Sequence, residues 1–158
     1  MSKRAAINTP APDFTLDDFT GKPVSLSGFT GKRHVVLVLN RGFMWPFCRK
    51  HLAQLRQDFH KFTVRDAVII SVGTENARNF AAYWEENDLP FIGLPDEKRI
   101  VLKLYGQEVK LFKLGRMPAQ MIVDKKGILR FAHYGHSMSD IPENDELLTI
   151  LDDLQGEE

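Results

Sequence analysis

The stretch of sequence that decides the fold is VVLVLNRGFMWPFC, residues 35–48. Val35 to Leu39 form an unbroken run of branched apolar residues, which is typical of a central strand buried on both faces of a sheet. Beyond this stretch, apolar residues recur at helical spacing, at Leu52, Leu55, Phe59 and Phe62. The sequence therefore predicts a buried strand that leads through a loop into a helix, with Cys48 at or near the helix start.

The flanking sequence repeats this alternation of strand and helix. It predicts an N-terminal hairpin over 12–31 and a second buried strand over 67–72. Two helices should follow, one through Ala77, Phe80, Ala81 and Trp84 with Thr74 as N-cap, and a weaker one over 96–105. The chain should then form a hairpin with strands 121–123 and 128–134, and a last helix through Leu147, Ile150, Leu151 and Leu154. This order indicates an α/β fold in which helices flank a mainly parallel sheet that ends in an antiparallel pair.

Length, composition and charge narrow the class of protein. The 158 residues are 43% hydrophobic, with 21 basic and 21 acidic side chains, so we expect one domain over residues 1–158 with a full core. The zero net charge argues against a nucleic-acid partner, and no apolar run is long enough to span a membrane. The first twelve residues lack the features of a signal or transit peptide, so the sequence predicts a cytoplasmic protein.

Cys48 is the residue best suited to chemistry. It is the chain's one cysteine, so a disulfide would have to involve a second molecule. A helix N-terminus and the nearby cations Arg41, Arg49 and Lys50 favour the thiolate form, which is the nucleophile. The alternative is that Cys48 is an inert buried apolar residue. For metal binding, His51 near Cys48 and the pair His133/His136 lack further ligands, so we expect no metal site.

Five motifs occur along the chain in a recognisable order. They are residues 11–16 (APDFTL), 21–26 (GKPVSL), the strand running into Cys48 at a helix start, 69–72 (IISV) and 122–127 (IVDKKG). Together they resemble the peroxiredoxins, the alkyl hydroperoxide reductase/thiol-specific antioxidant family of the thioredoxin fold. The resemblance covers nearly the whole chain. It implies a thioredoxin-like α/β fold, with a central mixed sheet flanked by helices and an N-terminal β-hairpin extension.

The segment before Cys48 departs from the family pattern. In the family the peroxidatic cysteine ends a P-x-x-x-T-x-x-C motif whose hydroxyl hydrogen-bonds the peroxide, and here those two positions hold Arg41 and Trp45. An indole donates but does not accept a hydrogen bond, so Trp45 cannot replace the hydroxyl as an acceptor. The segment is also similar to a subgroup with the pattern R-G-x-W-C-P-x-C, and in this chain the first of the two cysteines of that pattern has been replaced. Cys48 then holds the attacking position, and Trp45 and Pro46 shape the pocket.

Two further residues are candidates by resemblance. The family uses an arginine near the strand before the hairpin to pair with the thiolate, and Arg116 lies two residues earlier than that position. A solvated charge in a loop is the alternative for Arg116. Pro118 falls where related thioredoxin folds carry a cis-proline that turns a backbone edge toward the sulfur.

The resemblance implies a single-cysteine peroxidase without a cofactor. Cys48 would reduce hydrogen peroxide or an organic hydroperoxide, become a sulfenic acid, and be restored by an external low-molecular-weight thiol or a thioredoxin-like protein. Arg41 or Arg116 would stabilise the thiolate and the negative charge that develops on the leaving oxygen. Two alternatives stay open: a monothiol disulfide-exchange protein, and a thioredoxin-fold binding module that has lost catalysis. Peroxiredoxins often dimerise, so a homodimer is also open, although no residue identifies an interface.

Overall fold

The protein, in a computed structural model that describes residues 4–107, 109–110 and 115–157, is built on a five-stranded mixed sheet. The strand order is β5-β4-β3-β8-β9, and the bounds are β3 His34–Leu39, β4 Ala67–Gly73, β5 Ile92–Pro95, β8 Ala119–Val123 and β9 Leu129–Tyr134. β3, β4 and β5 are parallel, whereas β8 and β9 run antiparallel to their neighbours. The expected parallel sheet with an antiparallel pair is confirmed.

Strand β3 lies at the centre of the sheet, and all six of its residues are buried. Alternate side chains of a strand point to opposite faces, so Val36 and Val38 pack on one face while Leu37 and Leu39 pack on the other. The apolar run of the sequence therefore supplies both layers of core at once.

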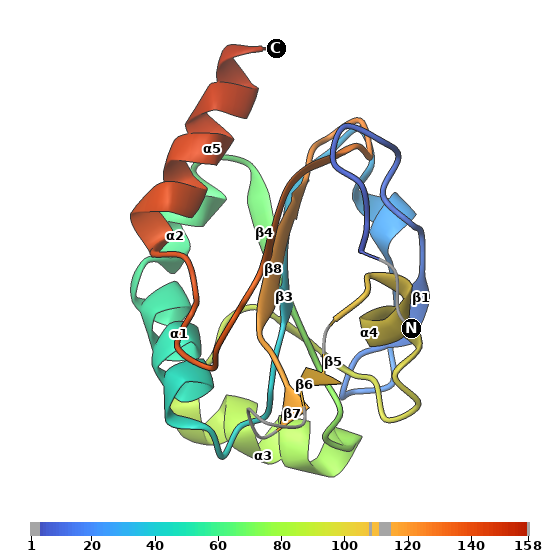
Figure 1. The fold of residues 1–158 in the computed structure, drawn as a ribbon, viewed down its shortest axis with the longest axis vertical. Helices are drawn as coiled ribbons and strands as arrows, with labels where there is room; N and C mark the ends of the chain where they lie inside the picture. The colour runs from blue at the N-terminus through green and yellow to red at the C-terminus, as the bar shows by residue number, and fades with distance from the viewer. Residues whose placement is uncertain (1–3, 108, 111–114, 158) are drawn as a thin grey trace.

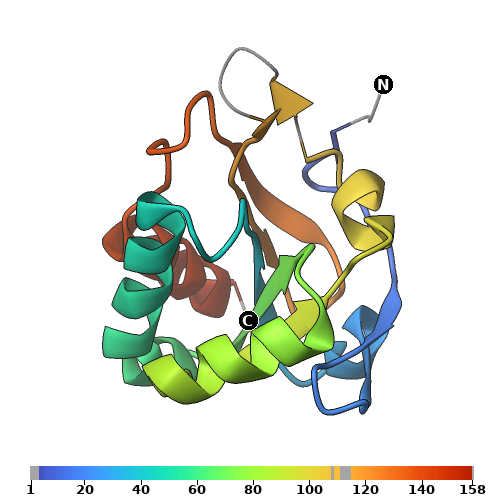
Figure 2. The ribbon, with the colours of Figure 1, turned by 90° about the horizontal axis from the view of Figure 1, so that it is seen from below.

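Helices and the N-terminal hairpin cover the two faces of the sheet (Figures 1 and 2). One face packs against α1 Pro46–Gln57, α2 Phe59–Thr63, α3 Ala77–Asn87 and α5 Asn144–Gly156. The other packs against α4 Ile100–Leu104, the 3₁₀ helix Leu26–Phe29 and the hairpin of β1 Thr15–Asp17 and β2 Pro23–Ser25. Within the described ranges, no helix is long and apolar enough to cross a membrane.

Some local features differ from the sequence-based expectation. Strand β5 and the small pair β6 Val109–Lys110 and β7 Gly115–Arg116 were not expected from the pattern. The N-cap of α3 is Asn76, whose side chain accepts a hydrogen bond from the Asn79 N–H at 2.8 Å, and not Thr74. Glu75 instead accepts the Phe43 N–H, and the helix starts two residues later than expected.

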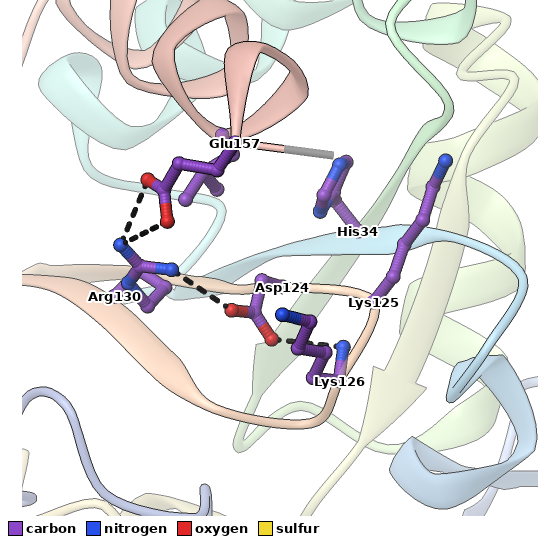
Figure 3. Close-up of a pocket in the computed structure, with 7 residues that line it drawn as sticks. His34, Asp124, Lys125, Lys126, Arg130 and Glu157 are labelled. Atoms are coloured by element: carbon purple, nitrogen blue, oxygen red, sulfur yellow. Dashed lines mark hydrogen bonds and ion pairs between the residues drawn. The ribbon is translucent and has the colours of Figure 1, made fainter.

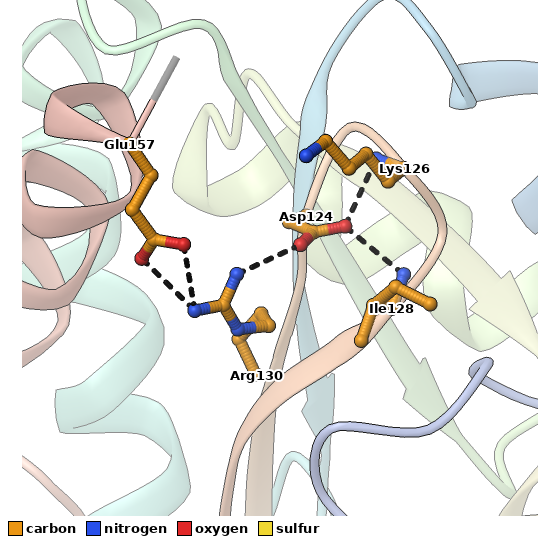
Figure 4. Close-up of polar contacts among 5 residues, drawn as sticks. All are labelled: Asp124, Lys126, Ile128, Arg130 and Glu157. Atoms are coloured by element: carbon orange, nitrogen blue, oxygen red, sulfur yellow. Dashed lines mark hydrogen bonds and ion pairs between the residues drawn. The ribbon is translucent and has the colours of Figure 1, made fainter.

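The hairpin between β8 and β9 is tied to the end of α5 by charged groups. The buried Asp124 carboxylate accepts hydrogen bonds from the N–H groups of Lys126 and Ile128, which closes the turn (Figure 4). Its other oxygen pairs with Arg130 at 3.2 Å, and Arg130 also binds Glu157 at 2.9 Å. A small hollow lies beside this network, with His34 at the start of β3 on its wall (Figure 3).

We expect Arg130→Ala to lower the free energy of unfolding by about 1–2 kcal/mol, because it leaves the buried Asp124 carboxylate without its cation. Lys126→Ala is the matched control, since the exposed Lys126 side chain joins no ion pair with the described residues. Urea unfolding followed by circular dichroism would compare the two variants. Equal stability of both would show that the network contributes nothing measurable.

Candidate functional site

Cys48 is the third residue of α1, as the sequence predicts. The helix begins at Pro46, whose fixed φ suits the first helical position, and Trp45 is the N-cap with extended backbone. The Arg49 N–H donates to the Trp45 carbonyl at 3.1 Å. The thiol is 2% exposed, so it sits at the floor of the loop that joins β3 to α1.

The backbone of this loop presents donors to the sulfur. The Arg41 N–H donates to Cys48 Sγ at 3.4 Å, and the Gly42 N–H also favours the thiolate. Gly42 has a φ of +153°, and a Cβ there would lie 3.2 Å from Trp45 Cδ1, so this position needs glycine. A loop of consecutive N–H groups aimed at one atom is an anion-binding arrangement.

The side chain of Arg41 is buried and held by several contacts. Its Nε donates to the Arg116 carbonyl at 2.6 Å, and its Nη1 contacts Met138 Sδ at 3.6 Å. Its guanidinium carbon lies 3.8 Å from the centre of the Trp45 ring. The two residues that depart from the family motif therefore stack on each other within the loop between β3 and α1.

The pKa of Cys48 is raised above its ordinary value, and burial of the thiol is the largest cause. The N–H groups of Arg41 and Gly42 and the charge of Arg41 act in the opposite direction, while Glu75 adds to the increase. The expectation that the helix start and nearby cations lower this pKa is therefore wrong. Arg49 and Lys50 are exposed, and Arg49 hydrogen-bonds Tyr83, so neither charge offsets the desolvation of the sulfur.

Glu75 is a site residue that the sequence reasoning missed. One of its oxygens accepts the Phe43 N–H at 2.7 Å, and the other is buried without a hydrogen-bond partner in the described part of the chain. Glu75 follows β4, the parallel neighbour of β3, and the C-terminal ends of parallel strands meet at one edge. The predicted pairing of these two parallel strands was the signal from which Glu75 could have been found.

Arg116 ends strand β7 and Pro118 precedes strand β8, on the segment whose backbone binds Arg41. The Arg116 carbonyl binds Arg41, but its half-buried guanidinium has no described contact with Cys48 and its Nε lacks a hydrogen-bond partner among the described groups. Burial and nearby Arg99 lower the Arg116 pKa. The peptide bond before Pro118 is trans, so the cis-proline expectation is wrong. The carbonyl of Pro118 itself accepts the Gly135 N–H at 2.9 Å.

His51 lies one helical turn beyond Cys48 on the same buried side of α1. It is 3% exposed, and neither ring nitrogen has a hydrogen-bond partner in the described structure. Burial lowers its pKa to about 4, so the imidazole is neutral near pH 7. It lines a hollow between α1 and the segment that follows β9.

Two other features of the structure bear on the site. Among residues 4–107, 109–110 and 115–157, no group of three His, Cys, Asp or Glu residues could hold a metal ion. The hollow of Figure 3 includes His34, which begins β3, whereas the cysteine loop follows the other end of β3. The six residues of β3, about 20 Å in length, lie between the start of the strand at His34 and that loop.

Comparison with known proteins supports the family. Residues 7–132 match the model of the AhpC/TSA family. The chain is 32% identical over 150 residues to a chloroplastic peroxiredoxin Q of Sedum lineare, covering 94% of this chain and 78% of that protein. It is 35% identical over 124 residues to a chloroplastic peroxiredoxin Q of Triticum aestivum, covering 77% of this chain but only 56% of that protein.

Solved structures agree on the fold. A reduced 2-Cys peroxiredoxin of Plasmodium vivax superposes with a TM-score of 0.84 at 18% identity, covering 97% of this chain and 98% of that one. Peroxidoxin BcpB of Mycobacterium tuberculosis gives 0.79 at 22% identity, covering 97% of each chain. The thioredoxin-like fold with its N-terminal hairpin is therefore confirmed.

The chain belongs to the AhpC/TSA family, and it is a thiol peroxidase of the peroxiredoxin type. The expectation of a cytoplasmic protein is contradicted, because the relatives reported above are chloroplastic proteins. The absence of a recognisable transit pattern in the first residues was too weak an observation to support that expectation.

We expect Glu75→Gln to lower the pKa of Cys48, because it removes a negative charge and keeps an oxygen that can accept the Phe43 N–H. The alkylation rate of Cys48 at pH 7 should rise about threefold to tenfold, as one charge at this range changes an ionisation by of order 1 kcal/mol. Iodoacetamide labelling against pH would measure it, with wild-type titration above the ordinary thiol value of about 8.5. An unchanged profile would mean that Glu75 does not act on the sulfur.

His51 should make the protein less stable in mild acid. The pKa of His51 is about 6.5 in the unfolded chain and about 4 in the folded protein. Its contribution to the free energy of unfolding is therefore full above pH 6.5 and is lost as the pH falls toward 4. The loss is about 3 kcal/mol. His51→Gln should reduce this slope in urea unfolding between pH 7 and 4, whereas the same change at the exposed His60 should leave it intact. A slope unaffected by His51→Gln would contradict this assignment.

Proposed function

We propose that Cys48 is the peroxidatic residue of this thiol peroxidase and that it works by a single-cysteine cycle. The thiolate attacks one oxygen of the peroxide, the O–O bond breaks, and the leaving oxygen takes a proton to become water or an alcohol. Cys48 is left as a sulfenic acid, which an external thiol must reduce. No other cysteine exists in the chain to resolve it.

The observation that carries this proposal is the set of donors on the sulfur. The Arg41 N–H lies 3.4 Å from Sγ, and the charge of Arg41 favours the thiolate. The same groups can stabilise negative charge as it moves from sulfur to the leaving oxygen. In this proposal Arg41 has the role of the thiolate-pairing arginine, and Arg116 holds Arg41 in place through its carbonyl.

Trp45 and Pro46 complete the proposed entrance to the thiol. Pro46 is exposed at the first position of α1, and Trp45 is partly exposed beside it. Because the indole cannot accept a hydrogen bond from the peroxide and burial disfavours the thiolate, we expect a slow peroxidase. Loss of one hydrogen bond to a transition-state oxygen costs on the order of 10²–10³ in rate.

The partners follow from the single-cysteine cycle. The substrate is hydrogen peroxide or an organic hydroperoxide, and the reductant is a low-molecular-weight thiol or a thioredoxin-like protein. Disulfide exchange through a mixed disulfide and a binding role without catalysis are the competing outcomes of the test. A homodimer stays a prediction.

The test is to mix reduced protein with one equivalent of hydrogen peroxide and trap the product with dimedone. We expect mass spectrometry to find a sulfenic acid adduct on Cys48, formed faster than on free cysteine, and turnover only with added thiol. Cys48→Ser should lose the activity entirely, whereas Arg41→Lys should slow oxidation, because lysine lacks the fork that holds Arg116 and Met138. A rate no higher than that of free cysteine would favour the binding role.

A further inference from the structure

Met138 is a methionine that contacts the cysteine loop from a distant part of the chain. It lies in the segment between β9 and α5, which passes beside α1 (Figures 1 and 2). Its Sδ lies 3.6 Å from Arg41 Nη1, and the N–H of Arg41 donates to Cys48 Sγ at 3.4 Å. A single residue, Arg41, therefore connects Met138 to the reactive sulfur.

A closed turn holds Met138 in this position. The Asp140 carboxylate accepts the His136 N–H at 2.8 Å and contacts His133 Nε2 at 2.9 Å, so it ties the turn to strand β9. A Cβ at Gly135 would lie 2.8 Å from the Asp140 carbonyl oxygen, so the two ends of the turn are closely packed. The turn therefore keeps the thioether against the guanidinium.

Met138 is also open to a small oxidant. Its side chain is half-buried, whereas Met117 and Met121 are 1% and 0% exposed. Peroxides convert thioethers into sulfoxides. The sulfur attacks one peroxide oxygen and loses two electrons, the O–O bond breaks, and the other oxygen takes the proton and leaves as water or an alcohol. In a thiol peroxidase, the substrate itself supplies this oxidant.

A sulfoxide would change the contact with Arg41. A thioether sulfur is a weak acceptor, whereas a sulfoxide oxygen carries partial negative charge and accepts a strong hydrogen bond from a guanidinium. The charge of Arg41 favours the thiolate of Cys48, and the charge of Glu75 opposes it. A further negative atom bound to the guanidinium weakens the field that favours the thiolate.

We propose that Met138 is a site of oxidation by peroxide and that its sulfoxide, bound to the Arg41 guanidinium, slows the reaction of Cys48. Met138 is then a positioning residue, because it acts on the sulfur through Arg41. The proposal rests on the function proposed above and adds a form of regulation to the same site. The thiol becomes less reactive when peroxide accumulates beyond what the cycle removes.

The first experiment finds which methionines are oxidised. Hydrogen peroxide is added together with dithiothreitol, which keeps Cys48 reduced and does not reduce a sulfoxide. Peptide mass spectrometry should find an added oxygen on Met138 and on Met44, which is 79% exposed, and none on the two buried methionines. Oxidation of Met44 without oxidation of Met138 would overturn the proposal.

The second experiment measures iodoacetamide labelling of Cys48 before and after the same treatment. The wild-type rate at pH 7 should fall about threefold to tenfold, and the midpoint of its pH profile should move to higher pH. Met138→Leu keeps the volume but cannot form a sulfoxide, so its rate should be the same before and after treatment. Met44→Leu is the matched control, and its rate should fall as the wild-type rate does.

A variant that needs no treatment checks the role of the oxygen. Met138→Gln places a carbonyl oxygen near Arg41, so its labelling at pH 7 should be about threefold slower than that of Met138→Leu. Equal rates in these two variants, or an equal fall in the wild type and Met138→Leu, would overturn the proposal. Labelling does not depend on peroxide reduction by Cys48. A Cys48 that reacts with peroxide no faster than free cysteine would therefore overturn the single-cysteine function alone.

Discussion

The hydrogen bond from the Arg41 N–H to the Cys48 sulfur is the contact on which the site depends, and much of the surrounding structure fixes its two ends. The Asn40 N–H binds the Val72 carbonyl, which extends the β3–β4 ladder into the loop. The Gln107 amide then donates to the carbonyls of Leu39, Asn40 and Met117. Strand β3, its neighbours and the loop therefore form one rigid support for the donor.

That support has a cost for the chemistry. A loop held firmly against the sheet buries the sulfur, and burial disfavours the charged form more than the donors favour it. Glu75 has two opposite effects on the site. Its carboxylate holds Phe43 in the loop that carries the donors, whereas its negative charge disfavours the thiolate. The order of the site therefore comes at the expense of thiolate formation.

The sequence predicted the positions of the helices and strands better than it predicted the effect of nearby charges on the Cys48 pKa. The buried runs and the helical spacing placed β3, β4, α1, α3 and α5, because those patterns depend on local periodicity. The direction of the Cys48 pKa shift depended on how deeply the sulfur lies and on Arg49 binding Tyr83, and neither is a local property. Arg116 and Pro118 were assigned by counting along a family pattern, and a count shows neither the backbone contact from Arg116 to Arg41 nor the trans bond before Pro118.

The two departures from the family motif belong together in physical terms. Arg41 occupies the proline position and Trp45 the threonine position, and the guanidinium lies 3.8 Å from the ring centre. A partly desolvated pair of this kind contributes of order 1–2 kcal/mol. Replacing Trp45 by threonine alone would remove one side of the stack and leave Arg41 with its contacts to Arg116 and Met138. The pair replaces a hydroxyl acceptor with a cation whose charge favours the thiolate. Because the two side chains contact each other, their separate effects on the reaction cannot be added.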